Sequence, residues 1–415
     1  MLERFVFCFF LCYIRNDFFI KQDFFCFPGK VSEVAISYYI PKLFLAPMEG
    51  VADRAFRMSC AKFFPQFDEA TTEFIRLPRG GHIPSLISVY DPHELSPLPL
   101  AAQVMTHCAE GAGQIARALE ARGAPRIELN CGCPSNTVVG RGAGSALLED
   151  PHYLQKILLS MRAAISGVFS VKMRLGYKDR ARFEENLDII AACGVDHVTI
   201  HPRTKIEGYS LPCHWDQLEV ARKRLTMPIV GSGEIKNCAD AWAMTQLLQS
   251  DCIPTPYQNM GLMVGRAALG KPWIFAQIKR FFIAKALQEG LLSVQGQKKL
   301  LVDLNATEDA LSIDKAMQWL EHLYVIWQIK LVSSKQRVRR IKQQINSLFD
   351  PRLYAHIGSV HSCIPSTPPL GERLHERVET LRKSLLRDQS EEAQLFLRVK
   401  THWKEILMAS GELFI

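Results

Sequence analysis

From residue 43 onward, short apolar runs alternate with amphipathic segments. Each run ends in a glycine, a proline or a polar residue, which is typical of a buried strand followed by a turn. The eight runs cover residues 43–48, 69–72, 101–105, 127–130, 170–174, 197–202, 228–233 and 261–265. Segments with helical spacing lie between them, at residues 109–122, 151–165, 182–193, 215–224 and 237–248. Strands that alternate with helices predict a parallel sheet.

Eight strand–helix units over about 230 residues match the usual size of a (β/α)8 TIM barrel. We therefore assign residues 41–290 to an α/β fold of this type. A doubly wound open sheet is the alternative, although residues 43–50 lack a G-x-G-x-x-G turn. Two prolines precede the eighth strand, and we expect an inserted loop at residues 253–259.

The alternation ends after Trp273, and the rest of the chain has only helical patterns. We predict helices at residues 300–304, 316–328, 338–348, 370–386 and 392–408, with a loop or linker at 358–369. Residues 295–415 thus form a predicted smaller all-helical C-terminal domain. Its basic cluster consists of Lys330, Lys335, Arg337, Arg339, Arg340 and Lys342. The cluster is either a solvated helix face or a surface for a nucleic-acid backbone.

Residues 1–40 are an atypical aromatic leader. Their apolar stretch, residues 5–14, lies between Arg4 and Arg15 and is too short to span a bilayer as a helix. We interpret this segment as the product of an upstream start, and a membrane-associating leader is the alternative. The sequence contains no later candidate for a membrane span.

Composition limits the class of protein. The chain has 415 residues, 48% of them hydrophobic, and a formal net charge of +8, which favours an anionic partner. Its 12 cysteines form no Cys-x-x-Cys pair and no zinc-ligand spacing. This pattern indicates reduced thiols in a cytoplasmic protein without a metal site.

Polar residues follow every predicted strand. Active sites of such barrels lie at the carboxyl ends of the strands, so these residues should surround one mouth. They are Pro47, Met48, Glu49, Thr72, Glu73, Gln103, Asn130, Cys133, Lys172, Arg174, His201, Arg203, Ser232, Gly233, Glu234, Gly265 and Arg266.

Two of these strand ends predict specific chemistry. After the fourth strand, Cys131 and Cys133 precede a glycine-rich loop, where a titratable thiol could meet a bound group. The alternative is a structural pair of small buried residues. The loops after the seventh and eighth strands contain glycines beside Ser232 and Arg266, which is typical of a phosphate site in these barrels. Ordinary strand-to-helix turns are the alternative there.

The segment from Leu43 to Phe282 resembles the tRNA-dihydrouridine synthases, flavin enzymes with an FMN-binding barrel and a C-terminal helical domain. The motifs that carry this resemblance are APMEGV with Asp53, TEF, LNCGCPS, VKMRLG, HPRT, GEI and GRA. Within the family, PMEGV and TEFIR are most similar to the bacterial subgroup C, which acts on uridine 16 of the tRNA D-loop.

The resemblance implies residue roles in the reduction of a D-loop uridine to 5,6-dihydrouridine. Cys133 corresponds to the acid that protonates C5, while FMN, re-reduced by NADPH, delivers hydride to C6. Positions at the flavin ring or ribityl chain are Pro47, Met48, Glu49, Gln103, Lys172 and His201. Positions at the phosphate are Ser232, Gly233, Glu234, Gly265 and Arg266. Positions at the tRNA are Arg76, Asn130, Tyr209, Arg340 and Lys342. We expect a cytoplasmic monomer that binds tRNA and neither a membrane nor a metal.

Three positions depart from the family pattern. Ser232 stands in place of the usual asparagine, Asn136 in place of a common lysine, and Pro202 in place of a common glycine. Two rival functions remain open, an FMN barrel enzyme that acts on a small molecule and an inactive RNA-binding homologue.

Overall fold

The computed structural model describes residues 40–135, 140, 142–249, 260–289, 294–303, 312–331, 333–354 and 370–410. Contacts divide the chain into two units, residues 1–32 and 33–415, and every described residue belongs to the second. Three predicted features lie outside the described residues: the leader apart from Ile40, the inserted loop at 253–259 and the linker at 358–369. The departure at Asn136 also lies outside them.

Eight parallel strands close into a barrel. They are β1 (Lys42–Leu45), β2 (Glu69–Thr71), β4 (Leu100–Thr106), β5 (Arg126–Cys131), β6 (Val168–Gly176), β7 (His197–Thr204), β8 (Ile229–Ser232) and β9 (Met260–Val264). The sheet order runs from β2 through β1 and β9 down to β4, and a β2–β4 pairing closes the ring. The predicted (β/α)8 barrel is therefore confirmed, and the open-sheet alternative is wrong.

One strand was not predicted from the pattern of apolar runs. The three-residue β3 (Ile75–Leu77) pairs with the far half of β4, beyond the point where β2 pairs with it. It carries Arg76, whose register partner on β4 is Met105.

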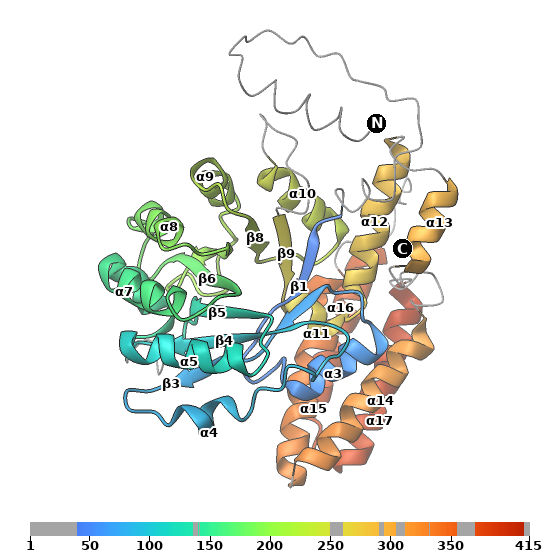
Figure 1. Cartoon of the computed structure of the whole chain (residues 1–415). Helices are drawn as coiled ribbons and strands as arrows, with labels where there is room; N and C mark the ends of the chain where they lie inside the picture. The colour runs from blue at the N-terminus through green and yellow to red at the C-terminus, as the bar shows by residue number, and fades with distance from the viewer. Residues whose placement is uncertain are drawn as a thin grey trace. The chain divides into compact units, whose positions relative to one another are not determined.

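Helices follow the strands around the barrel (Figure 1). They are α3 (Arg54–Phe63), α4 (Ile83–Ile87), α5 (Ala109–Ala121), α7 (Pro151–Arg162), α8 (Phe183–Ala192), α9 (Asp216–Arg224), α10 (Cys238–Leu248), α11 (Arg266–Gly270) and α12 (Ile274–Gln288), with the 3-10 turn η1 (Gly144–Glu149) before α7. Local sequence explains their starts. Asp150 accepts a hydrogen bond from the Tyr153 amide, and Pro151 occupies the first helical turn.

The C-terminal part is helical, as predicted. It contains α13 (Val294–Asp303), α14 (Ile313–Lys330), α15 (Ser334–Leu348), the 3-10 turn η4 (Pro351–Leu353), α16 (Leu370–Arg387) and α17 (Glu392–Ser410). Trp403 of α17 packs against Trp273 before α12 and Trp319 of α14, with ring centroids 5.8 and 5.9 Å apart. Trp319 also meets Phe56 of α3 edge-on at 5.9 Å. These helices thus share a continuous apolar core with the barrel, and their separation as a domain at residue 295 stays a prediction.

Candidate active site

A cavity of about 830 Å³ lies at the carboxyl ends of the strands and continues into a second hollow at β8 and β9. This volume suits a cofactor-sized ligand. The structure brings every residue predicted for catalysis or cofactor binding to these walls: Pro47, Met48, Glu49, Gln103, Cys133, Lys172, His201, Ser232, Gly233, Glu234, Gly265 and Arg266. Asn130 and Tyr209, which were predicted to contact tRNA, line the cavity as well.

The loop that carries Cys133 is held from three sides. Asn130 Oδ1 accepts hydrogen bonds from the backbone N–H groups of Gly132 and Cys133, each at 2.9 Å. Arg174 Nε donates to the Gly132 carbonyl at 2.9 Å. Ser145 Oγ donates to the Cys133 carbonyl at 2.9 Å. The backbone of Cys133 is therefore held in place by its neighbours.

The Cys133 thiol is suited to hold a proton. Burial raises its pKa, and the nearby carboxylate of Glu49 acts in the same direction, while Arg174 and Lys172 oppose them. The thiol is therefore protonated at neutral pH. Cys131, by contrast, is fully buried in the apolar core, so the structural interpretation holds for one cysteine of the pair and not for the other.

Lys172 projects from β6 beside the Cys133 loop, and it is the register partner of Asn130. Burial lowers the pKa of its ammonium group to about 8, and the carboxylate of Glu128 works against that shift. Lys172 therefore keeps its charge at neutral pH but loses it under mildly alkaline conditions.

His201 presents a buried nitrogen without a protein partner. Its Nδ1 has no hydrogen bond within the described part of the chain, and the residue is only 8% exposed. Burial lowers its pKa well below the usual value, and Arg174, Lys172 and nearby arginines add to the effect. The ring is neutral, and an unpaired nitrogen in a cavity wall fits a ligand that can hydrogen-bond to it.

The far end of the cavity is suited to an anion. Gly233 lines this hollow with a φ of +98°, and a Cβ there would lie 2.7 Å from Cys213 Sγ, so the position requires glycine. Burial lowers the pKa of Arg266, and so does the positive charge of Arg352. Arg352 is itself paired with Asp350 at 2.6 Å, so Arg266 is the guanidinium suited to a negative ligand in this hollow.

Glu234 has a different role from a direct phosphate contact through its side chain. Arg203 holds its carboxylate in a salt bridge, and the Cys213 amide donates to it at 3.4 Å. Burial raises the pKa of this carboxyl, but these partners bring the net value below the usual one, so the group is ionised. A carboxylate repels phosphate, and so only the backbone of Glu234 is suited to face one.

Sequence reasoning missed the contribution of the C-terminal helices. Asp350 and Arg352, from the turn η4, line both hollows, and Gln343 of α15 lines the larger one. No motif identifies them, because only the packing of the C-terminal helices on the barrel brings them to the mouth.

Of the other residues predicted to contact tRNA, Tyr209 lies at the cavity, whereas Arg340 and Lys342 lie on α15. Tyr209 stands at the rim, half-exposed, with the Arg266 guanidinium 4.5 Å from its ring centroid. Arg340 donates to the Gly50 carbonyl and pairs with Asp53 at 3.1 Å. Lys342 Nζ donates to two carbonyls at the end of α16. Arg340 and Lys342 thus have partners within the chain, whereas the sequence pattern suggested an open basic face.

Two other features are absent from the described residues. Among them, no three His, Cys, Asp or Glu side chains are grouped as metal ligands. No helix in the described ranges is both long and apolar enough to cross a membrane.

Comparisons with known proteins agree on one family. The family model described as "Dihydrouridine synthase (Dus)" matches residues 44–355. The chain is 31% identical over 250 residues to a tRNA-dihydrouridine(16) synthase of Neisseria meningitidis serogroup B, covering 58% of this chain and 72% of that one. It is 34% identical over 253 residues to the tRNA-dihydrouridine(16) synthase of Shewanella oneidensis, covering 57% and 75%. It is also 29% identical over 269 residues to tRNA-dihydrouridine synthase B of Pseudomonas syringae pv. tomato, covering 64% and 75%.

Proposed function

The chain belongs to the dihydrouridine synthase family, and from that premise we propose that it reduces uridine 16 in the D-loop of tRNA to 5,6-dihydrouridine. The observation that carries the proposal is the meeting of a protonated thiol, Cys133, with Lys172 and His201 in one cavity of the barrel. Position 16 is supported by the names of two similar proteins.

The cavity fits FMN. When bound, FMN supplies the hydride that reaches C6 of the uracil ring, and NADPH restores the reduced cofactor. The unpaired Nδ1 of His201 and the ammonium of Lys172 suit its polar ring edge. The backbone of Gly233 and the guanidinium of Arg266, which both line the second hollow, suit its phosphate. We propose that Pro47, Met48, Glu49, Gln103, Ser232, Glu234 through its backbone, and Gly265 complete the site.

Cys133 donates the proton to C5 of the base. A general acid must carry its proton at the working pH and stand within reach of the acceptor. The raised pKa of Cys133 satisfies the first condition, and its place in the cavity wall beside Asn130 and Lys172 supports the second. Both conditions depend on the loop contacts that hold the residue still.

The tRNA must present its base outside the stack, because the cavity admits a single base and not a folded loop. We propose that Tyr209 at the rim, Arg76 on β3 and Asn130 in the wall contact the RNA. We also propose contacts from Arg340 and Lys342 on α15. On α15, Lys335 and Arg339 are exposed and suited to phosphate contacts. We further propose that residues 295–415 act as the tRNA-binding domain of a cytoplasmic monomer.

The direct test is reconstitution. The purified protein with oxidised FMN should be yellow, and after NADPH is added it should form dihydrouridine in an unmodified tRNA transcript. A matched transcript with cytidine in place of uridine 16 should remain unchanged. Formation at another uridine would contradict the position, and oxidation of NADPH only with a small pyrimidine or an enone would contradict the substrate class.

Salt dependence gives a second test of the substrate class. Binding of tRNA through several phosphates should weaken steeply with added salt, by about one unit of log–log slope for each phosphate contact. Binding that does not respond to salt would contradict a charged RNA surface. A colourless protein that still binds tRNA would support the binding-only alternative.

A further inference from the structure

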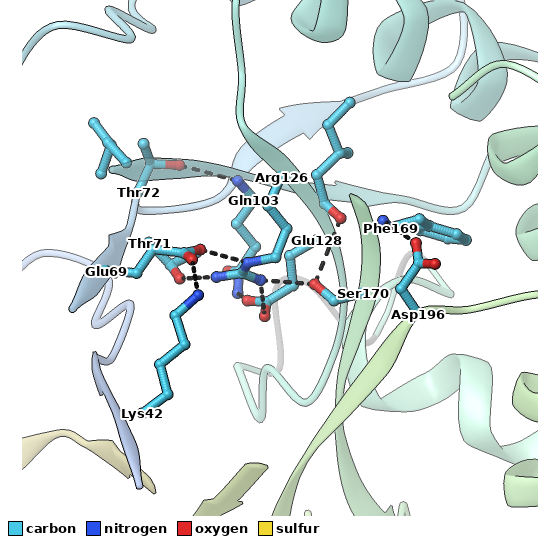
Figure 2. Close-up of polar contacts among 12 residues, drawn as sticks. Lys42, Glu69, Thr71, Thr72, Gln103, Arg126, Glu128, Phe169, Ser170 and Asp196 are labelled. Carbon is cyan, nitrogen blue, oxygen red and sulfur yellow. Dashed lines mark hydrogen bonds and ion pairs between the residues drawn. The ribbon is translucent and has the colours of Figure 1, made fainter. Parts of the chain in front are cut away.

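A buried salt bridge joins Arg126 and Glu128 of β5, and Glu69 and Lys42 extend it (Figure 2). Arg126 donates to Glu128 Oε2 at 2.8 Å and to Glu69 Oε1 at 2.5 Å, and Lys42 Nζ lies 2.9 Å from Glu69. Arg126 is 3% exposed and Glu128 is fully buried. Because desolvation offsets much of the attraction in such a pair, stability alone does not account for it.

Two amide side chains connect Glu128 to the loop of Cys133. Gln103 Nε2 donates to Glu128 Oε1 at 2.7 Å. Gln103 Oε1 accepts from Asn130 Nδ2 at 2.8 Å. Asn130 Oδ1 then accepts from the N–H groups of Gly132 and Cys133. An unbroken series of hydrogen bonds therefore joins a buried carboxylate to the backbone of the proposed acid.

Strand pairing places these groups next to one another. Arg126, Glu128 and Asn130 alternate along β5, so all three turn to the interior of the barrel. Gln103 of β4 is the register partner of Glu128, and Lys172 of β6 is the register partner of Asn130. The series thus runs beside the residues that form the cavity floor.

The two ends of the series determine how both amides are oriented. Backbone N–H groups only donate, so Asn130 must turn its oxygen to the loop and its amino group to Gln103. A carboxylate only accepts, so Gln103 must turn its amino group to Glu128 and its oxygen to Asn130. Without a charged acceptor at position 128, only Asn130 would orient the Gln103 amide. If that amide rotated by half a turn, Asn130 would lose its acceptor.

We infer that Glu128 is a positioning residue, which acts through Gln103 and Asn130 to hold Cys133 where it can protonate the bound base. The inference rests on the proposed function of Cys133 and adds a residue that touches neither substrate nor cofactor. Glu128 also lies close enough to Lys172 to favour its charged form. Loss of the Glu128 carboxylate therefore changes mainly the position of Cys133, and to a smaller extent the charge of Lys172.

The test is the rate at which iodoacetamide alkylates Cys133 in the full-length protein without tRNA. The rate is followed by mass spectrometry for the peptide that contains this residue, across a series of pH values. In Glu128→Gln and Asn130→Ala the loop loses support, the thiol gains access to water, and its raised pKa falls. Only the thiolate reacts with iodoacetamide. At a pH below the pKa of the thiol, the alkylation rate of the variant should therefore be about tenfold higher for each unit by which its Cys133 pKa is lower than that of the wild type.

Ser170→Ala is the matched control. Ser170 accepts a hydrogen bond from the same guanidinium of Arg126, at 2.6 Å, but takes no part in the series that reaches the loop. This variant should keep the wild-type alkylation profile. The double variant Glu128→Gln/Asn130→Ala should react no faster than Asn130→Ala alone, because both changes act through one link.

An unchanged Cys133 profile in a folded Glu128→Gln protein would overturn the inference, and so would strictly additive effects in the double variant. If Glu128→Gln does not fold, Glu128→Asp replaces it, because a shorter carboxylate keeps the charge beside Arg126 without reaching Gln103. Alkylation does not depend on tRNA reduction. A wild-type protein that reduces no tRNA, yet shows these alkylation effects, would therefore refute the proposed function and leave the role of Glu128 in the loop intact.

Discussion

Two cysteines that are one residue apart have unlike surroundings. Cys131 is the last residue of β5 and lies in the apolar core, where burial keeps its thiol neutral and inaccessible. Cys133 follows in the loop, half-buried at the cavity wall. The chemical difference thus arises from position: one thiol ends a strand and the other faces a ligand site.

Cys133→Ala tests the proton donor. Removal of a general acid lowers the rate by about a hundredfold to ten-thousandfold, so reduction of tRNA should fall by that amount. The variant should remain yellow, because the residue is not needed to hold the flavin. The measurement is single-turnover reduction of a tRNA transcript, with flavin absorbance as the control. Full activity in the yellow variant would remove the assignment.

Lys172 predicts a pH effect of definite sign. A lysine is charged below its pKa, so an ammonium whose pKa is about 8 loses its charge as the pH rises through that value. The rate of tRNA reduction should therefore decline above about pH 8, at lower pH than any decline due to Cys133, whose pKa lies above its usual value. In Lys172→Met this decline should be absent and the rate low throughout. If the decline above about pH 8 persisted in Lys172→Met, it would have to arise from the titration of another group.

At the scale of elements, β5 shows what an apolar run conceals. Residues 127–129 were interpreted as a buried apolar strand, and a strand is present there. Its sequence alternates, however, and the polar positions Arg126, Glu128 and Asn130 face the inside of the barrel. The alternation is visible in the sequence, but the sequence does not show which set of residues faces the inside of the barrel. The usual rule places apolar residues in the interior, whereas here the polar residues of β5 face the inside of the barrel.

The basic cluster on α15 was interpreted as either a solvated helix face or a surface for a nucleic-acid backbone. In the structure Arg337 pairs with Glu392 at 2.8 Å. Arg340 donates a hydrogen bond to the Gly50 carbonyl and forms an ion pair with Asp53, both in the loop after β1. Since Met48 and Glu49 precede Gly50 in that loop, α15 supports the cavity wall directly. The charges on this helix therefore divide into a docking side and an exposed side.

Arg340→Ala and its neighbour Arg339→Ala separate those two sides. Loss of Arg340 removes a hydrogen bond and a partly buried ion pair, and unfolding free energy should fall by about 1–3 kcal/mol. Arg339 is exposed, so its removal should leave stability unchanged and reduce the salt slope of tRNA binding by about one unit. Urea unfolding and tRNA titrations at several salt concentrations measure both. Equal unfolding free energies of the two variants would contradict the role of Arg340 in holding α15 against the loop after β1.

At the scale of the whole molecule, the barrel and its ring of site residues follow from the sequence, because strand ends in a closed barrel meet at one place. Other parts do not. Helix α12 was missed because nine of its residues are buried, which leaves no polar face to give a helical period. Strand β3 is only three residues long. The approach of Asp350 and Arg352 to the cavity depends on packing between distant segments, which no local pattern encodes.

The most direct test of the central claim is a map of dihydrouridine, position by position, in tRNA from cells with and without this gene. Deletion should remove dihydrouridine at position 16 alone, and Cys133→Ala should not restore it. Loss at a different D-loop position would keep the enzyme class and overturn the position. An unchanged map, in cells without a second enzyme of the same specificity, would contradict the proposed function.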